Sequence, residues 1–173
     1  MKITVVGLGK IGLPLAVQFA KKGHTVTGLD INESTVGSVN QGIEPFPGEA
    51  GLGALLQQTT ESGGLRATTS YREAIPDAEV VVVVVPLFIN SDNQPDFTWL
   101  DSATESIGAN LTRGTLVSYE TTLPVGTCRN RWAPQLEEQS GLREGKDFHV
   151  VFSPERVLTG RVFEDLKKYP KLV

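Results

Sequence analysis

The stretch from Lys2 to Asp30 constrains the fold of this chain more than any other. The glycine pattern G-x-G-x-x-G occupies residues 7–12, with a short apolar run before it and a segment with one apolar helical face after it. A second apolar run, residues 25–29, leads directly into Asp30. The glycines alone would be a weak signal. The order strand, glycine turn, helix, strand and acid is the context that marks a dinucleotide-binding fingerprint.

Each glycine has its own physical role in such a loop. Gly7 lets the chain turn sharply out of the strand, Gly9 leaves the backbone bare where a pyrophosphate approaches, and Gly12 lets the helix lie close to the strand. Lys10 and Ile11 complete the loop. Because the first N–H groups of a helix are unpaired and lie at its positive dipole end, we expect these five residues to bind the phosphates of a cofactor.

Asp30 stands where a carboxylate can accept hydrogen bonds from the hydroxyls of the adenosine ribose. The 2′-phosphate of NADP would meet this carboxylate as a like charge, so the sequence predicts NAD as the cofactor. Two alternatives stay open. The glycine-rich turn could bind nothing, with Asp30 as a solvated strand end, or it could bind a flavin.

Length and composition are those of an ordinary globular domain. The 173 residues are most simply one domain, with 39% hydrophobic and 21% charged residues. A net charge of −4 without any basic stretch argues against nucleic acid as a partner. The longest apolar run, residues 80–89, is interrupted by Pro86 and is too short to span a bilayer. With no leader pattern at the N-terminus, we expect a cytoplasmic protein and no membrane contact.

Metal and disulfide chemistry are not expected. The single cysteine, Cys128, excludes an internal disulfide framework and a cysteine metal cluster, and we interpret it as a small buried residue. His24 and His149 lie beside predicted strands without a partner at metal-ligand spacing, and we interpret both as structural.

Six apolar runs with the character of strands alternate with segments of helical periodicity. The six valines of residues 80–85 are typical of a strand covered on both faces. Strands separated by helices indicate parallel pairing with right-handed crossovers. The sequence therefore predicts an α/β fold, a doubly wound parallel six-stranded sheet of the Rossmann type with strand order 3-2-1-4-5-6. The strands are expected at residues 3–6, 25–29, 65–68, 80–85, 115–118 and 148–152.

Between the strands, apolar spacing and capping residues predict the remaining structure. Glycines and prolines indicate an irregular loop at residues 42–51, and a polar, irregular stretch is expected towards the end of residues 87–96. The tail from residue 163 to 173 is expected to begin a further helix and a strand. The other helices are expected to follow Gly12 and to lie at residues 32–40, 52–60, 71–75, 96–108 and 127–139.

Two polar segments leave the carboxyl ends of the fifth and sixth strands. The first contains Thr121 and Thr122, and the second contains Glu155. In a doubly wound sheet, ligands bind at this edge. Both segments are therefore candidates for ligand binding.

Three separated motifs now resemble those of a known family. They are Gly7-Leu-Gly-Lys-Ile-Gly-Leu-Pro14, Thr121-Thr-Leu-Pro-Val-Gly126 and Phe152-Ser-Pro-Glu-Arg156. Together they resemble the NAD-binding portion of the UDP-glucose/GDP-mannose dehydrogenase family over essentially the whole chain. The form Ser-Pro-Glu-Arg-Val is most similar to the branch that oxidises UDP-N-acetylhexosamines, the UDP-N-acetylmannosamine dehydrogenase branch.

The resemblance implies a four-electron oxidation with two NAD in succession. The sugar C6 alcohol becomes an aldehyde, a cysteine captures the aldehyde, and the thioester left by the second hydride transfer is hydrolysed. By motif position, Thr122 would help hold the catalytic water near the nicotinamide, and Glu155 would be the acid/base or water-orienting carboxylate. Thr121, Val85 and Pro86 would contact the cofactor. Many relatives carry Thr-Pro after the fourth strand, where this chain has Val85-Pro86. The threonine hydroxyl near the cofactor is therefore missing here, which leaves backbone contacts.

Structural interpretations of the two catalytic candidates stay open beside these roles. Thr122 could be a turn hydroxyl that bonds to the backbone before Pro124. Glu155 could be a solvated loop carboxylate paired with Arg156.

Length is the largest departure from the family. The family has a central helical domain, which carries the nucleophilic cysteine and forms the homodimer, and then a nucleotide-sugar domain. Residues 1–173 match neither, and Cys128 does not match the position of the nucleophile. We therefore expect an NAD-binding domain truncated before those domains and inactive on a nucleotide sugar by itself. A stand-alone NAD-sensing module and a small reductase of the 3-hydroxyacid type remain alternatives.

Overall fold

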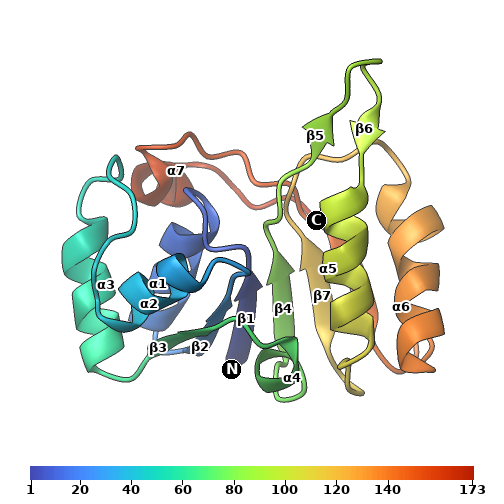
Figure 1. Cartoon of the computed structure of the whole chain (residues 1–173), viewed down its shortest axis with the longest axis horizontal. Coiled ribbons are helices and arrows are strands. Elements are labelled where there is room, and N and C mark those ends of the chain that lie inside the picture. The colour runs from blue at the N-terminus through green and yellow to red at the C-terminus, as the bar shows by residue number, and fades with distance from the viewer.

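The strands of the computed structural model, which describes all residues 1–173, form one parallel sheet in the order β3-β2-β1-β4-β7-β8 (Figure 1). Since β7 and β8 are the fifth and sixth strands of this sheet, the predicted order 3-2-1-4-5-6 is confirmed. The sheet strands are β1 (Lys2–Val6), β2 (Thr25–Leu29), β3 (Leu65–Thr68), β4 (Val80–Val83), β7 (Leu116–Tyr119) and β8 (His149–Phe152).

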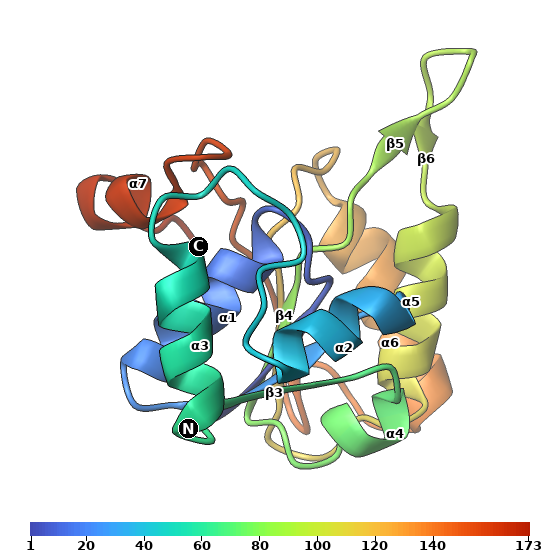
Figure 2. The same ribbon diagram turned by 60° about the vertical axis from the view of Figure 1, so that its left-hand side comes forward.

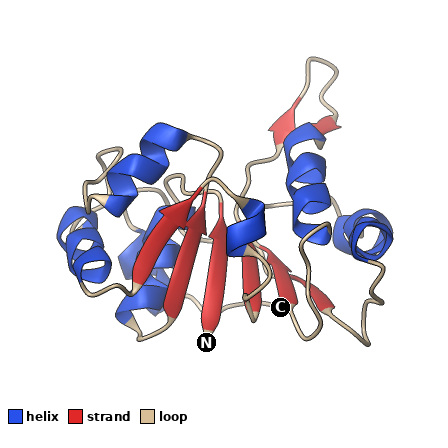
Figure 3. Cartoon of the chain, turned by 60° about the horizontal axis from the view of Figure 1, so that its bottom comes forward, coloured by secondary structure: helices blue, strands red, loops and turns tan.

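Helices cover both faces of the sheet, as the continuous apolar runs of its central strands require (Figure 3). None of them combines the length and the apolarity that crossing a membrane requires. The helices are α1 (Gly12–Lys21), α2 (Glu33–Asn40), α3 (Leu52–Glu61), α4 (Tyr71–Ala74), α5 (Thr98–Gly108), the π-helix η1 (Cys128–Trp132), α6 (Ala133–Ser140) and α7 (Val162–Lys168).

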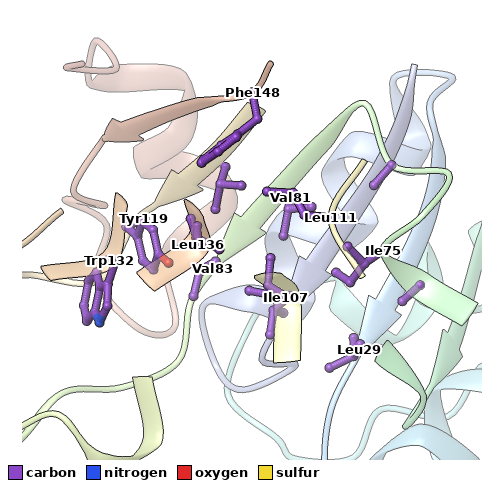
Figure 4. Packing of buried hydrophobic residues seen from close by; sticks show 14 of the residues in the cluster. Leu29, Ile75, Val81, Val83, Ile107, Leu111, Tyr119, Trp132, Leu136 and Phe148 are labelled. Atoms are coloured by element: carbon purple, nitrogen blue, oxygen red, sulfur yellow. The ribbon is translucent and has the colours of Figure 1, made fainter. Parts of the chain in front are cut away.

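Alternate residues of the central strands enter two separate cores. In β4, Val82 packs in the cluster that contains the buried residues of α1 and α3, whereas Val81 and Val83 pack in the cluster formed with α5 and α6. Figure 4 shows the second cluster, in which the ring of Trp132 stacks on Tyr119 with centroids 4.4 Å apart. This alternation, with both faces buried, is the physical reason for the valine run.

Three predicted elements differ in detail. The valine strand ends at Val83, so Val84 and Val85 already belong to the loop above the sheet. The helix expected over residues 127–139 begins as η1 and becomes α-helical only at Ala133, where Pro134 occupies a position in the first turn that needs no donor. The expected tail helix is present as α7, but residues 170–173 form no strand.

A small two-stranded ribbon was not predicted. The stretch expected to end irregularly pairs with itself as β5 (Phe88–Ile89) and β6 (Pro95–Asp96), which are antiparallel. The ribbon projects beyond the carboxyl edge of the main sheet (Figure 2). The ring of Phe88 contacts Trp99 edge-on, with centroids 5.1 Å apart, so the ribbon rests on the start of α5.

Candidate functional site

The glycine loop lies between the end of β1 and α1, and each glycine has the geometry that the sequence predicts. Gly7 has φ +94° and donates its N–H to the carbonyl of Leu29, 2.8 Å away, which turns the chain across the end of β2. A Cβ on Gly12 would lie 1.8 Å from the carbonyl oxygen of Gly7. A Cβ on Gly9 would meet no atom within 4 Å. Gly7 and Gly12 are therefore required by the fold, whereas Gly9 faces open space.

The start of α1 offers a set of unpaired donors. The backbone N–H groups of residues 9–12 form no hydrogen bond within the protein, and the first turn of α1 contains no acidic residue. Lys10 is exposed and Ile11 is half-buried in the same turn. Unpaired N–H groups at the positive end of a helix favour an anion, so this turn can hold a pyrophosphate.

Asp30 is half-buried and holds the loop in place from the end of β2. Its Oδ2 accepts the N–H of Leu8 at 2.7 Å, and its Oδ1 accepts the N–H of Asn32 at 2.9 Å. The sequence predicted a partner for ribose hydroxyls, whereas the bonds in the structure show a structural task that was not predicted. Each oxygen retains a lone pair, so the carboxylate can still accept a bond from a sugar hydroxyl.

A hollow of about 330 Å³ opens beside the glycine loop and Asp30. Its lining is mostly apolar, and this suits an adenine ring and its ribose. Burial, with the Asp30 carboxylate as the smaller cause, raises the pKa of Tyr71, so its phenol stays neutral in the wall. The lining residues are Val6, Gly7, Leu29, Asp30, Ile31, Tyr71, Val85, Pro86, Thr98, Trp99, Ser102 and Ala103.

Four of these twelve wall residues were predicted as cofactor contacts, and sequence reasoning missed the other eight, among them Ile31, Tyr71 and Trp99. Ile31 and Trp99 are 77% and 54% exposed, and both side chains line this one hollow. The position of Ile31 directly after Asp30, the predicted partner of the ribose, was the one available signal. Tyr71 and Trp99 come from α4 and α5, and only the folding of the chain brings them to the loop.

Thr121 connects this hollow to the end of β7. Its Oγ1 donates to the carbonyl oxygen of Val85 at 2.6 Å. Val85 and Pro86 both line the hollow, so three of the predicted cofactor contacts meet at one point of the carboxyl edge.

Thr122 and Glu155 also lie at this edge, in the segments that follow the neighbouring strands β7 and β8. The N–H of Glu155 donates to the carbonyl of Glu120 at 2.8 Å, which continues the pairing of β7 with β8 beyond the strand ends. Thr122 is exposed and its hydroxyl forms no hydrogen bond, so the alternative of a turn hydroxyl bonded to the backbone is wrong in this structure. No hydrogen bond joins the side chains of Thr122 and Glu155.

The partner of Glu155 is not the one considered from sequence. Its Oε2 accepts the ammonium of Lys171 at 2.7 Å, and its Oε1 accepts the backbone N–H of Arg156. The guanidinium of Arg156 instead donates to the carbonyl of Pro170. The side chain of Glu155 is only 10% exposed, so the alternative of a solvated carboxylate paired with the Arg156 side chain is wrong.

Glu120 is a buried carboxylate that sequence reasoning did not single out. It is 6% exposed at the end of β7, where its Oε2 accepts the Lys171 ammonium at 2.5 Å and its Oε1 accepts the hydroxyl of Ser118 at 3.2 Å. Burial raises the pKa of Glu120, and the Lys171 ammonium opposes that rise. The signal in the sequence was a charged residue directly after a buried strand.

Cys128 lies apart from the glycine loop, in the wall of a second hollow of about 590 Å³ at the face of η1 and β8. The sequence predicted a buried residue, but Cys128 is half-buried. Burial raises the pKa of its thiol to about 11, so it is protonated at neutral pH and a poor nucleophile. The larger hollow contains no glycine-loop residue, so the smaller one is the candidate cofactor site.

Comparison with known proteins agrees with this geometry. The model of the UDP-glucose/GDP-mannose dehydrogenase family, NAD binding domain, matches residues 1–173. A UDP-N-acetyl-D-mannosamine dehydrogenase of Pyrococcus horikoshii is 37% identical over 96% of this chain and 39% of its own length. A UDP-N-acetyl-D-glucosamine 6-dehydrogenase of Pseudomonas aeruginosa is 40% identical over 92% of the chain and 36% of its own length.

Solved structures give the same result. A ternary complex of GDP-mannose dehydrogenase from Pseudomonas aeruginosa superimposes with a TM-score of 0.92 at 30% identity, covering 96% of this chain and 38% of that one. The UDP-D-ManNAc dehydrogenase of Pyrococcus horikoshii gives a TM-score of 0.90 at 36% identity, covering 96% and 39%. The chain thus spans a little over a third of the length of each relative.

Proposed function

The chain belongs to the UDP-glucose/GDP-mannose dehydrogenase family, as its NAD-binding domain, and from this premise we propose that it supplies the cofactor half of a nucleotide-sugar dehydrogenase. The proposed reaction oxidises the C6 alcohol of a UDP-hexose, or of a UDP-N-acetylhexosamine, to the uronate with two NAD. The unpaired N–H groups of residues 9–12, beside an open Gly9 and the Asp30 carboxylate, carry this proposal.

The residues present fit NAD. The start of α1 would hold the pyrophosphate, Asp30 the adenosine ribose, and the apolar hollow with Tyr71 and Trp99 the adenine. A 2′-phosphate would be repelled by Asp30, so NAD is preferred to NADP. Bound NAD supplies the hydride acceptor, and the task of the protein is to orient it.

Thr122 and Glu155 are the proposed catalytic residues of this domain. The exposed Thr122 hydroxyl is free to hold a water molecule at the edge of the sheet. Glu155, fixed on the neighbouring segment, would orient that water and accept its proton. Both would serve the hydrolytic step that releases the acid.

The complete reaction needs groups from outside residues 1–173. Trapping an aldehyde requires a nucleophile. Cys128 lies at the other hollow with a raised pKa, so it does not meet this need. We propose that the nucleophile and the nucleotide-sugar site belong to the part of the relatives that this chain does not match, that the whole protein is a homodimer, and that it acts in the cytoplasm.

One experiment tests the proposal. The purified chain is titrated with NAD, then incubated with NAD and a panel of UDP-sugars while NADH absorbance is followed. We expect binding without turnover, and turnover once the matching remainder of a relative is supplied. Failure to bind NAD would refute the proposal. Sustained acid formation that is lost in Cys128→Ser would show that the chain is a complete enzyme.

Binding of NAD without turnover in any combination would favour the alternative of an NAD-sensing module. Turnover of a 3-hydroxyacid in place of a UDP-sugar would favour the small reductase.

A further inference from the structure

We propose that Lys171, anchored on Glu120, is a positioning residue that fixes the carboxylate of Glu155 at the carboxyl edge of the sheet. The inference rests on the catalytic role proposed for Glu155. It adds two residues that act through Glu155 and need not touch the substrate.

The ammonium of Lys171 lies between two carboxylates from neighbouring strands. It contacts the Oε2 of Glu120 at 2.5 Å and the Oε2 of Glu155 at 2.7 Å. The two glutamates are 6% and 10% exposed, whereas Lys171 is 40% exposed. Charge-assisted bonds at such distances are short and directional, so the ammonium determines where both carboxylates point.

The two carboxylates differ in their freedom to move. Glu120 follows the last residue of β7 directly, and its second oxygen accepts the hydroxyl of Ser118, so it is anchored to the sheet. Glu155 belongs to the loop after β8, which crosses above the sheet on its way to α7 (Figure 1). Besides Lys171, its side chain accepts only the N–H of the next residue, Arg156.

The backbone around Lys171 is itself held against this loop. The hydroxyl of Ser153 donates to the carbonyl of Leu172 at 2.6 Å, and the guanidinium of Arg156 donates to the carbonyl of Pro170. The backbone is thus held in place on both sides of Lys171, the residue that carries the ammonium. A fixed donor holds its acceptor better than a mobile one, since less side-chain entropy is lost on forming the bond.

Removing the ammonium would turn an attraction into a repulsion. Two carboxylates that share one ammonium face each other without it, and like charges in a partly buried site do not stay together. Glu120 keeps its bond to the hydroxyl of Ser118 on β7, whereas Glu155 keeps only its bond to the N–H of Arg156 in the same loop. Glu155 is therefore the group that rotates away, and its carboxylate loses its orientation.

The test uses the ¹³C,¹⁵N-labelled chain and the three-bond couplings that report the χ1 rotamer of Glu155. We expect a single rotamer in the unaltered chain and averaged couplings in Lys171→Met. Lys171→Arg, which keeps the charge, should restore the single rotamer. Lys167→Met, which removes an α7 lysine without a salt bridge, is the matched control and should leave the couplings unchanged.

Glu120→Gln provides a second variant should Lys171→Met not fold. It leaves Lys171 and Glu155 in place but removes the anchoring charge, so we expect partial averaging at Glu155. A single unchanged rotamer in Lys171→Met, or in Glu120→Gln when that is the variant that folds, would overturn the proposal. Equal averaging in Lys171→Arg and Lys171→Met would also overturn it, because charge would then not matter.

NAD is titrated into the same samples to separate the two proposals. An unaltered chain that does not bind NAD would contradict the proposed function and leave the rotamer result standing. An unaltered chain that binds NAD while Glu155 ignores Lys171 would contradict only the positioning role.

Discussion

Replacing Gly9 by valine should abolish NAD binding and leave the fold intact. A Cβ at this position meets no atom of the protein within 4 Å, and Gly9 does not have the positive φ that would exclude other residues. A residue that fits the native backbone narrows the unfolded ensemble more than glycine does. We therefore expect Gly9→Val to change the free energy of unfolding by less than about 1 kcal/mol.

The loss of binding follows from the same open space. A branched side chain at Gly9 would occupy the approach to the unpaired N–H groups of residues 9–12. Each hydrogen bond to a charged group contributes about 1.5–3 kcal/mol. Losing two of them weakens binding by at least about 3 kcal/mol, which is more than about 100-fold in Kd.

Calorimetric titration with NAD and urea unfolding together measure both quantities. Gly12→Ala is the contrasting control, because its Cβ would lie 1.8 Å from the carbonyl oxygen of Gly7 and the backbone must shift. We expect that variant to lose about 1–3 kcal/mol of stability, in the range of overpacked sites. Retention of NAD affinity within threefold in Gly9→Val would show that the phosphates bind elsewhere. A stability loss equal to that of Gly12→Ala would refute the claim of open space.

Three further changes have defined outcomes. Asp30→Ala should weaken NAD binding by about 1–3 kcal/mol and NADP binding by less. Titration of both proteins with both cofactors measures these changes. Equal affinities of the unaltered chain for NAD and NADP would contradict the preference for NAD. Asp101→Asn should lower the free energy of unfolding at pH 7 by about 1–2 kcal/mol, because its carboxylate accepts bonds from Arg131 and Trp132. The bond from Arg131, and then that from Trp132, lowers the pKa of Asp101 below 3.8. The stability that Asp101 contributes is therefore present above pH 3.8 and is lost as the pH falls through the folded-state pKa. A stability deficit of Asp101→Asn in urea unfolding that did not shrink in acid would argue against this. Burial raises the pKa of Glu120 above 4.5, so its contribution is most favourable below pH 4.5 and is lost as the pH rises through the folded-state pKa. Glu120→Gln should remove that part of the pH dependence above pH 4.5, and identical pH profiles of unfolding for the two proteins would contradict the burial argument.

The fold and the geometry of the glycine loop could be predicted because their determinants are local. Gly7, Gly9 and Gly12 act through the conformation and bulk of the backbone at their own positions, and the structure gives each the geometry expected. The valine run of residues 80–85 predicted a strand covered on both faces for a similar reason, since β-branching and side-chain alternation are properties of consecutive residues. Its last two residues left the strand, which no local pattern indicated.

The walls of the hollow beside the glycine loop depended on tertiary structure. Tyr71 and Trp99 have no pattern in common with the glycine loop, and they reach it because α4 and α5 follow strands that end at the same edge. The second task of Asp30, the bond to Leu8 22 residues earlier, likewise exists only once β1 and β2 are paired.

Glu120 and Glu155, which follow β7 and β8, show the difference between local and tertiary determinants more clearly. The sequence predicted Glu155 from its motif and Arg156 as its neighbour, because a one-dimensional pattern offers only nearby partners. Lys171 lies 51 residues from Glu120 and 16 from Glu155, and only the crossing of the final segment above the sheet brings its ammonium between them. A charge that is removed from water requires a partner, so the burial of the two glutamates makes the Lys171 ammonium necessary. The packing of the whole chain decides which residues are buried.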